Sequence, residues 1–255
     1  MIYCISDIHG EYDRFITMLG LIGLGPEDTL YILGDVIDRG PHPIKTLLKI
    51  MDMPNARFIL GNHELMMLET LKDGTDSVIT ADMSDLDGDT LERLMLWYRN
   101  GCKTTVEELH QLDREGQLSV TEYLKNALAY ERVGVNGQQF LLVHAGLMNF
   151  DPAAPLSEYA LYELVWARPD YSKPYFEDII TVTGHTPTMH IPGCPAPGRI
   201  FKATPHDPCT SSACQLSVIL PKFSLTCVSK PASNLGNLTK IWTAHLMHRG
   251  RAVLP

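Results

Sequence analysis

The chain has 255 residues, 45% of them hydrophobic and 20% charged, and its 21 Lys and Arg against 30 Asp and Glu give a formal net charge of −9. A chain of this size and hydrophobicity can bury a core, which argues against disorder. The excess of acid argues against nucleic acid as a partner, because affinity for a phosphate backbone comes from clustered Lys and Arg. The six cysteines include no CxxC pair and give no sign of a disulfide framework.

The amino-acid sequence shows neither a membrane-spanning helix nor a signal peptide. No apolar run reaches the ~18 to 20 residues that a membrane helix needs. Asp7 interrupts the first apolar run before the core of a signal peptide could form. We therefore expect a cytoplasmic protein without a membrane partner. The sequence gives no indication of the oligomeric state.

The charge is divided unevenly along the chain. Residues 1–191 have a net charge of −15, whereas residues 192–255 contain seven basic residues and a single acid, Asp207, for a net charge of +6. The second part also holds eight of the 17 prolines and four of the six cysteines. This change in composition predicts a main domain at 1–191 and an atypical, Pro-rich, basic segment at 192–255.

Short apolar runs alternate with helical patterns in the first part. The runs of strand length are Ile2 to Ile5, Thr29 to Leu33, Ala56 to Leu60, Phe140 to Val143 and Ile179 to Thr183. Helical spacing relates Phe15, Met18, Leu19 and Ile22, and again Ile44, Leu47, Leu48 and Met51 after Pro43. The order β-α-β-α-β predicts an α/β fold whose strands are buried on both faces.

Residues 65–130 form a long, polar stretch with mostly helical patterns, and we expect a helical insertion there. Ser119 and Glu122 match a capping box, which predicts a helix start at Ser119. The Asp-rich stretch from Asp73 to Asp89 suggests a calcium loop, but Thr90 stands where that loop needs Gly and Leu96 where it needs Glu. A solvated acidic loop is the better interpretation.

Residues with metal-binding or catalytic side chains follow all five strand-like runs. The motifs are Asp7-Ile8-His9-Gly10, Gly34-Asp35-Val36-Ile37-Asp38-Arg39-Gly40, Gly61-Asn62-His63-Glu64, His144-Ala145-Gly146 and Gly184-His185-Thr186. Loops at the carboxyl ends of strands converge on one crevice in an open α/β sheet. Carboxylate oxygens and neutral imidazole nitrogens suit Mn, Fe or Zn, and an Asp can bridge two ions. Each motif alone is ordinary turn or capping chemistry, but the five together predict a site for two metal ions.

This ordered series resembles the motifs of calcineurin-like metallophosphoesterases. The Asp-Arg-Gly and His-Glu endings resemble the phosphoprotein phosphatase branch, the serine/threonine protein phosphatases, and in particular its compact bacterial and phage members. The resemblance covers residues 1 to about 190. It implies an α/β (α+β) fold, namely a metallophosphoesterase β-sandwich flanked by helices, with the helical insertion at about 65–130. The segment 192–255 would partly complete the sandwich.

The resemblance also implies a ligand set for two divalent metal ions. Asp7 and His9 would bind the first metal, Asp35 would bridge, and the second metal would be bound by Asn62, His144 and His185. We expect Mn, with Fe and Zn as alternatives, because all three accept these oxygen and nitrogen ligands.

Further residues are implied to act on the substrate. Asp38 would orient His63, the proton donor to the leaving group, and the carboxylate would keep this His protonated near neutral pH. Arg39 would hold phosphate oxygens with its guanidinium fork. Val165 to Arg168 is similar to a stretch that supplies a further Arg, so Arg168 is the candidate, with an ordinary surface Arg as the alternative.

Two weaker features stay open. Trp97 to Gly101 resembles a segment near the substrate entrance of the family, although a buried Trp and a turn explain it equally well. His190 follows the last motif and could contact substrate, but a solvated His is the simpler interpretation.

The C-terminal part departs from the family. Further sandwich strands are expected there, and Ala213 to Leu220 and Phe223 to Val228 are the candidates. A shifted reading frame near residues 205–215 and a divergent, Pro-rich surface tail explain the change in charge equally well.

Three functions follow as hypotheses. The first is a phosphatase for phosphoserine or phosphothreonine in proteins, in which metal-bound hydroxide attacks phosphorus in line and no phosphoenzyme forms. The second is hydrolysis of a dinucleoside polyphosphate (Ap4A type) on the same scaffold. Asp38-Arg39 and Glu64 favour the first, because nucleotide-cleaving relatives resemble Ala-Arg-Gly and Asn-His-Asp at these places. The third is a non-catalytic phosphate-binding protein with a vestigial site, which the complete ligand set makes the weakest.

Overall fold

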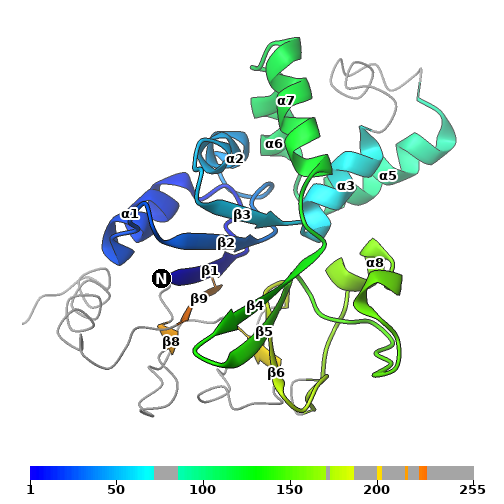
Figure 1. The fold of residues 1–255 in the computed structure, drawn as a ribbon. Coiled ribbons are helices and arrows are strands. Elements are labelled where there is room, and N and C mark those ends of the chain that lie inside the picture. The colour runs from blue at the N-terminus through cyan, green and yellow to red at the C-terminus, as the bar shows by residue number, and fades with distance from the viewer. Residues whose placement is uncertain (72–85, 171–172, 187–199, 203–215, 218–223, 229–255) are drawn as a thin grey trace, which may run out of the picture.

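The computed structural model describes residues 1–71, 86–170, 173–186, 200–202, 216–217 and 224–228. Its strands are β1 (Ile2–Ser6), β2 (Thr29–Leu33), β3 (Ala56–Ile59), β4 (Tyr130–Val135), β5 (Gln138–Val143), β6 (Ile179–Thr183), β7 (Ile200–Lys202), β8 (Leu216–Ser217) and β9 (Ser224–Val228). Its helices are α1 (Tyr12–Ile22), α2 (Pro43–Met51), α3 (Asn62–Thr70), α5 (Gly88–Arg99), α6 (Lys103–Leu109), α7 (Arg114–Lys125), α8 (Leu161–Val165) and the 3-10 turn η2 (Leu156–Glu158). The strands form two sheets, β3-β2-β1-β9-β8 and β4-β5-β6-β7 (Figure 1).

Alternate side chains of the central strands pack in opposite directions, as the two-residue period of a strand requires. Tyr3 and Ile5 of β1 belong to the core beneath α1 and α2, whereas Cys4 between them packs with Phe140 and Leu142 of β5. The strands β1, β2 and β3 are parallel. The predicted α/β fold with strands buried on both faces is confirmed, and the two sheets form a sandwich with helices outside.

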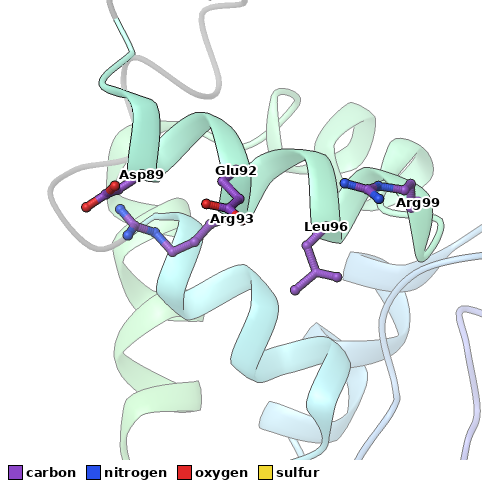
Figure 2. A pocket seen from close by; sticks show the side chains of 5 residues that line it. All are labelled: Asp89, Glu92, Arg93, Leu96 and Arg99. Carbon is purple, nitrogen blue, oxygen red and sulfur yellow. The ribbon is translucent and has the colours of Figure 1, made fainter.

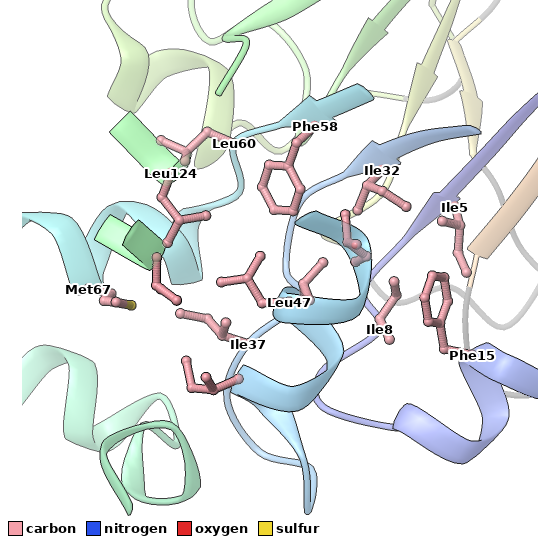
Figure 3. Close-up of a cluster of buried hydrophobic side chains, with 14 of the residues drawn as sticks. Ile5, Ile8, Phe15, Ile32, Ile37, Leu47, Phe58, Leu60, Met67 and Leu124 are labelled. Carbon is pink, nitrogen blue, oxygen red and sulfur yellow. The ribbon is translucent and has the colours of Figure 1, made fainter. Parts of the chain in front are cut away.

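The core under the helices, part of which is drawn in Figure 3 with Phe15 and Leu47, buries most of the first predicted helical stripe and half of the second. Phe15, Met18 and Ile22 of α1 are buried as expected, whereas Leu19 of the same predicted stripe is only partly buried. In α2 the buried face is formed by Ile44, Leu47 and Ile50, while Leu48 and Met51 are only partly buried. The predicted stripe was therefore rotated, because Ile50 as well as Met51 satisfies an apolar spacing from Leu47.

The second sheet contains a hairpin that the apolar runs did not predict. β4 and β5 pair antiparallel, and they are joined by Asn136 and Gly137, whose φ values of 50° and 81° are both left-handed. An Asn-Gly pair between two strands is the strongest short hairpin signal in a sequence. β4 has no apolar run, because Glu131, Arg132 and Gly134 separate its half-buried Tyr130, Val133 and Val135.

Helices α3, α5, α6 and α7 cover most of the described residues in the ranges 62–71 and 86–125 and confirm a helical insertion (Figure 1). The predicted start at Ser119 is wrong. The side chain of Asp113 accepts a hydrogen bond from the backbone N–H of Gly116, so α7 begins at Arg114 and Ser119 lies inside it. Asp87 caps α5 in the same way by accepting from Thr90 N at 2.7 Å, whereas Asp73 to Asp85 fall outside the described residues.

The change in charge near residue 192 does not separate the strands into two sheets. β7 pairs with β6 in one sheet, and β9 lies between β1 and β8 in the other. Of the two expected strands, Leu216–Ser217 and Ser224–Val228 are present. The division at residue 191 stays a prediction. In the described residues, no helix combines the length and the apolar character required to cross a membrane.

Candidate active site

The five predicted motifs meet where the parallel strands end. The strands β1, β2 and β3 lead to one set of motifs and the parallel pair β5 and β6 to the other. In chain order these strands deliver Asp7 and His9, Asp35 and Asp38, Asn62 and His63, His144, and His185. Because carboxyl ends of parallel strands share an edge, both sheets contribute side chains to one place.

Left-handed backbone conformations mark the same place independently of the motifs. The φ values are 57° at Asp7, 45° at His9, 56° at Asp35, 70° at Asp38, 68° at Arg39 and 62° at His185. Among the other non-glycine residues that the structure describes, only Asn136 and Asn149 share this feature. Such conformations cost about 1–3 kcal/mol each, persist only where the surroundings enforce them, and gather at functional sites.

Two glycines allow the loops after β2 and β3 to touch. A Cβ on Gly61 would lie 2.4 Å from Oδ1 of Asp35, and a Cβ on Gly34 would lie 2.4 Å from the Cα of Gly61. Any side chain at either position would push the two loops apart. Glycine in these motifs therefore leaves the room that the site needs.

Asp35, Asn62, His144 and His185 bring four electron-pair donors together. Nε2 of His144 lies 2.9 Å from Oδ1 of Asn62, 3.3 Å from Nδ1 of His185 and 3.4 Å from Oδ1 of Asp35. The Nδ1–H of His144 donates to the carbonyl of Leu33 at 2.6 Å, so Nε2 carries a lone pair. Lone pairs that face one another repel unless a cation lies among them, and this mixture of oxygen and nitrogen suits a divalent metal. The group contains the residues predicted for the second metal.

A second group of side chains, His9 and His63, lies near the other carboxylate oxygen of Asp35. Nε2 of His9 and Nε2 of His63 lie 3.8 and 3.9 Å from Oδ2 of Asp35. The Nδ1–H of His9 donates to the carbonyl of Ile37 at 3.0 Å, which again turns Nε2 inward. Arg39 donates to Nε2 of His9 at 3.0 Å and to Nε2 of His63 at 2.8 Å. Asp35 thus has one carboxylate oxygen toward each group, the arrangement that a bridging ligand requires.

Asp7 lies beside these groups. Both of its carboxylate oxygens accept the backbone N–H of His185, at 3.1 and 3.0 Å. On the first side, the side chains whose possible ligand atoms all lie within 4.8 Å of one another are those of His9, Asp35 and His63, and Asp7 is not among them. The assignment of Asp7 to the first metal stays a prediction.

The electrostatics of the site fit divalent cations. Burial, followed by the charges of Asp7 and Glu64, raises the pKa of Asp35 well above its usual value. Burial lowers the pKa of His144, and burial together with His63 lowers the pKa of His9 to about 4. The imidazoles are therefore neutral near pH 7 and offer lone pairs, while the carboxylates lack a compensating charge that metal ions would supply.

Asp38 and His63 form the expected pair, but burial opposes the expected charge of His63. Nδ1 of His63 lies 2.6 Å from Oδ2 of Asp38, and both side chains are buried. Burial, then the Arg39 charge, lowers the pKa of His63 to about 3, and burial raises the pKa of Asp38 to about 6. The sequence motif conveys only the attraction between the carboxylate and a charged ring. Removal of both groups from water and the guanidinium at Nε2 oppose that attraction.

Glu64 has a structural role that its motif did not reveal. Its carboxylate accepts the backbone N–H groups of Asp35 and Gly61 at Oε2 and those of Val36 and Ile37 at Oε1, at distances of 2.8–3.2 Å. Burial raises its pKa and these hydrogen bonds oppose that shift. Glu64 therefore ties the loop of the bridging Asp35 to the start of α3. The sequence signal was a Glu in the first turn of a helix, which ordinarily indicates only a cap.

Arg168 lies at the edge of the site. Its Nη1 donates to Oγ1 of Thr186, one residue after His185, at 2.9 Å. The Trp166 ring stands edge-on to His185 at 5.8 Å between centroids. Contact of Arg168 with phosphate stays a prediction. His190 lies outside the described residues.

Two hollows in the described surface lie elsewhere. One of about 340 Å³ follows α5 and is lined by Asp89, Glu92, Arg93, Leu96 and Arg99 (Figure 2). The other, of about 370 Å³, lies between α7, β4 and α8 and is mostly apolar. Neither hollow is lined by a predicted site residue. The candidate active site is therefore identified by the side chains that converge on Asp35 and not by a hollow in the surface.

A sandwich whose strand ends gather carboxylates, imidazoles and an Arg around one bridging Asp defines a metal-dependent phosphoesterase. The chain belongs to the calcineurin-like phosphoesterase family, whose model matches residues 1–203.

Curated relatives share part of the chain. The symmetrical bis(5'-nucleosyl)-tetraphosphatase of Acidovorax ebreus (strain TPSY) is 33% identical over 149 residues, which is 58% of this chain and 44% of that protein. The protein of the same name from Baumannia cicadellinicola is 39% identical over 95 residues, 33% of each chain. The matched region thus spans less than half the length of these relatives.

Solved structures share the fold. A putative diadenosine tetraphosphatase has a TM-score of 0.53 at 16% identity and is matched over 91% of this chain and 94% of its own. A protein serine/threonine phosphatase from Saccharomyces cerevisiae has a TM-score of 0.50 at 18% identity, over 79% of this chain and 65% of that one. At these identities the likeness concerns the fold alone.

Proposed function

We propose that this chain hydrolyses phosphoester or phosphoanhydride bonds with the help of two divalent metal ions. The observation that carries the proposal is Asp35, with one oxygen 3.4 Å from Nε2 of His144 and the other 3.8 Å from Nε2 of His9. Two ions held there would supply a nucleophile at neutral pH and offset the charge that develops on the phosphoryl oxygens. Mn is the expected metal, with Fe and Zn compatible with the same ligands.

The side chains around Asp35 have separate roles. Arg39 presents two guanidinium nitrogens next to His9 and His63, where they would hold phosphoryl oxygens in line for attack. Asp38 holds the His63 ring by Nδ1, which leaves Nε2 as the atom that would exchange a proton with the leaving group. Arg168 would contact the phosphate from the other edge of the site.

A dinucleoside polyphosphate is the substrate class that the comparisons favour. The first curated relatives are named symmetrical bis(5'-nucleosyl)-tetraphosphatases. This favours a dinucleoside polyphosphate over a phosphoprotein as substrate, the reverse of the preference drawn from Asp38 and Glu64 in the sequence. An aromatic pair beside the site also suits a nucleoside. Tyr162, 58% exposed, lies 6.2 Å from the Trp166 ring, which contacts His185. A base stacked on such a face gains about 1–3 kcal/mol.

A phosphoserine or phosphothreonine residue is the second candidate, and the Asp38–His63 pair favours it. A serine or threonine alkoxide is a poor leaving group that needs a proton, whereas a nucleoside phosphate leaves readily without one. A buried carboxylate that orients a His at the site is therefore of most use to an alkyl ester.

One assay with added Mn distinguishes these candidates. We expect the kcat/KM for a dinucleoside tetraphosphate to exceed that for a phosphothreonine peptide and a phosphotyrosine peptide. A higher kcat/KM for the phosphothreonine peptide would make phosphoprotein the favoured substrate class. If no substrate were turned over with Mn bound, the proposal that this chain is a hydrolase would be overturned. Asp35→Asn, assayed in parallel, excludes a contaminating phosphatase.

The aromatic pair gives a second test of the substrate class. Tyr162→Ala should raise KM for the tetraphosphate by about tenfold, as the loss of one stacked base predicts, and leave p-nitrophenyl phosphate unaffected. Leu118→Ala, which removes a 50% exposed side chain from α7, is the control. An equal effect of Tyr162→Ala on both substrates would remove the stacking role.

A further inference from the structure

The helical insertion contacts the catalytic pair through Trp97 and Thr105. Trp97 is the last buried residue of α5, and its Nε1–H donates to Oδ2 of Asp38 at 2.8 Å. Thr105 of α6 accepts the backbone N–H of Asp38 at 2.9 Å and donates its hydroxyl to Oδ1 of the same residue at 2.5 Å. Both side chains have no exposed surface. Each oxygen of the Asp38 carboxylate is thus held by a residue of the insertion.

The turn between α5 and α6 holds the next residue of the same motif. The backbone N–H of Arg39 donates to the carbonyl of Gly101 at 3.0 Å, and Nε of Arg39 lies 3.4 Å from the carbonyl oxygen of Asn100. A Cβ on Gly101, whose φ is 101°, would meet Cγ of Arg39 at 3.0 Å. The Asn-Gly turn therefore fits closely against the guanidinium arm.

The Asp38 carboxylate depends on these donors for its orientation. Oδ2 accepts from both Trp97 and His63, and Oδ1 accepts from Thr105. Asp38 also holds a left-handed backbone with φ of 70°, which needs support from its surroundings. If Trp97 and Thr105 lost their polar groups, the carboxylate could rotate and the His63 ring would lose its fixed direction.

We infer that Trp97 and Thr105 are positioning residues, which fix Asp38 and through it aim Nε2 of His63 at the leaving group. This inference rests on the proposed function of His63. It gives the insertion a part in the chemical step, because residues 59 and 67 positions after Asp38 complete its hydrogen bonds.

The test compares two aryl esters that carry the same phosphoryl group. Phenyl phosphate has the poorer leaving group and depends on a proton, whereas p-nitrophenyl phosphate does not. Trp97→Phe removes the N–H but keeps an aromatic ring, and Thr105→Val removes the hydroxyl but keeps the shape. Each should lower kcat for phenyl phosphate by about tenfold or more and change kcat for p-nitrophenyl phosphate by less than about twofold. Thr105→Ser should restore the wild-type ratio.

A double-mutant cycle separates positioning from a general loss of structure. In a His63→Asn background, Trp97→Phe and Thr105→Val should cause no further loss on phenyl phosphate, because all act through one group. A loss that adds to that of His63→Asn overturns the inference. Thr121→Val is the matched control, because Thr121 is also buried but donates to the carbonyl of Gln117 in α7.

The outcomes distinguish the inference from the proposed function. If His63→Asn lowers the phenyl phosphate rate selectively while Trp97→Phe and Thr105→Val do not, the inference alone is overturned. If His63→Asn lowers kcat equally for both esters, His63 is not the proton donor, and the inference about Trp97 and Thr105 is overturned as well. Mn content and thermal unfolding of every variant show that the metal and the fold are retained.

Discussion

At the scale of single residues, the bridging carboxylate gives the sharpest prediction. Asp35 has one oxygen toward His144 and the other toward His9 and His63. Asp35→Asn should therefore weaken both metal ions together, whereas loss of a ligand to one ion would weaken that ion first. Metal content by elemental analysis after dialysis against graded Mn checks this, with His144→Ala for comparison. Two ions retained at full occupancy would remove the bridging role.

Glu64 supports a prediction on stability and metal binding together. Glu64→Gln would direct an amide NH₂ at backbone N–H donors, which should lower the free energy of unfolding by about 2 kcal/mol or more and loosen the Asp35 loop. Glu108→Gln is the matched control, because Glu108 also accepts two backbone N–H groups, those of Ile44 and Lys45, away from the site. Urea unfolding and Mn titration measure the two effects. Equal Mn affinity in both variants would show that Glu64 acts on stability alone.

At the scale of elements, two glycines with open space at Cβ should respond in opposite directions to the same substitution. Gly20 lies in α1 and Gly137, with φ of 81°, in the β4–β5 turn, and a Cβ on either meets nothing within 4 Å. Gly20→Ala should stabilise by about 0.5–1 kcal/mol through helix propensity, whereas Gly137→Ala should destabilise by about 1–2 kcal/mol through left-handed strain. Thermal unfolding of both variants decides, and the same sign in both would contradict the argument.

The strands and the site motifs could be predicted because they depend on local patterns. Thr29–Leu33 and Ile179–Thr183 match the predicted runs residue for residue. The contact of Trp97 and Thr105 with Asp38 could not be predicted, because hydrogen bonds across 59 and 67 residues follow from helix packing and leave no local periodicity. The charge of His63 also depended on three-dimensional burial, which the Asp38–His63 pairing did not convey.

At the scale of the whole molecule, β8 and β9, which follow the charge boundary, belong to the same sheet as β1, β2 and β3. Because β9 pairs with β1 over Ile2 to Ser6, a chain that ends at residue 203 should expose one edge of β1. We expect a lower melting temperature and self-association of this shortened chain, since an unpaired strand edge is a template for other chains. Light scattering and thermal unfolding measure both. Unchanged values would show that the pairing of β9 contributes little.

The pairing of Ile2 with Val228 has a consequence for biosynthesis. During synthesis, β1 must wait for more than two hundred further residues before its second neighbour, β9, exists, and contacts of such sequence separation form late. Meanwhile β1 has only β2 beside it, and the nascent chain presents an open apolar edge. Residues Asp7 and His9 directly follow this strand, so the placement of these two predicted metal ligands would depend on the synthesis of β9. Chaperone demand during translation should therefore be concentrated at β1.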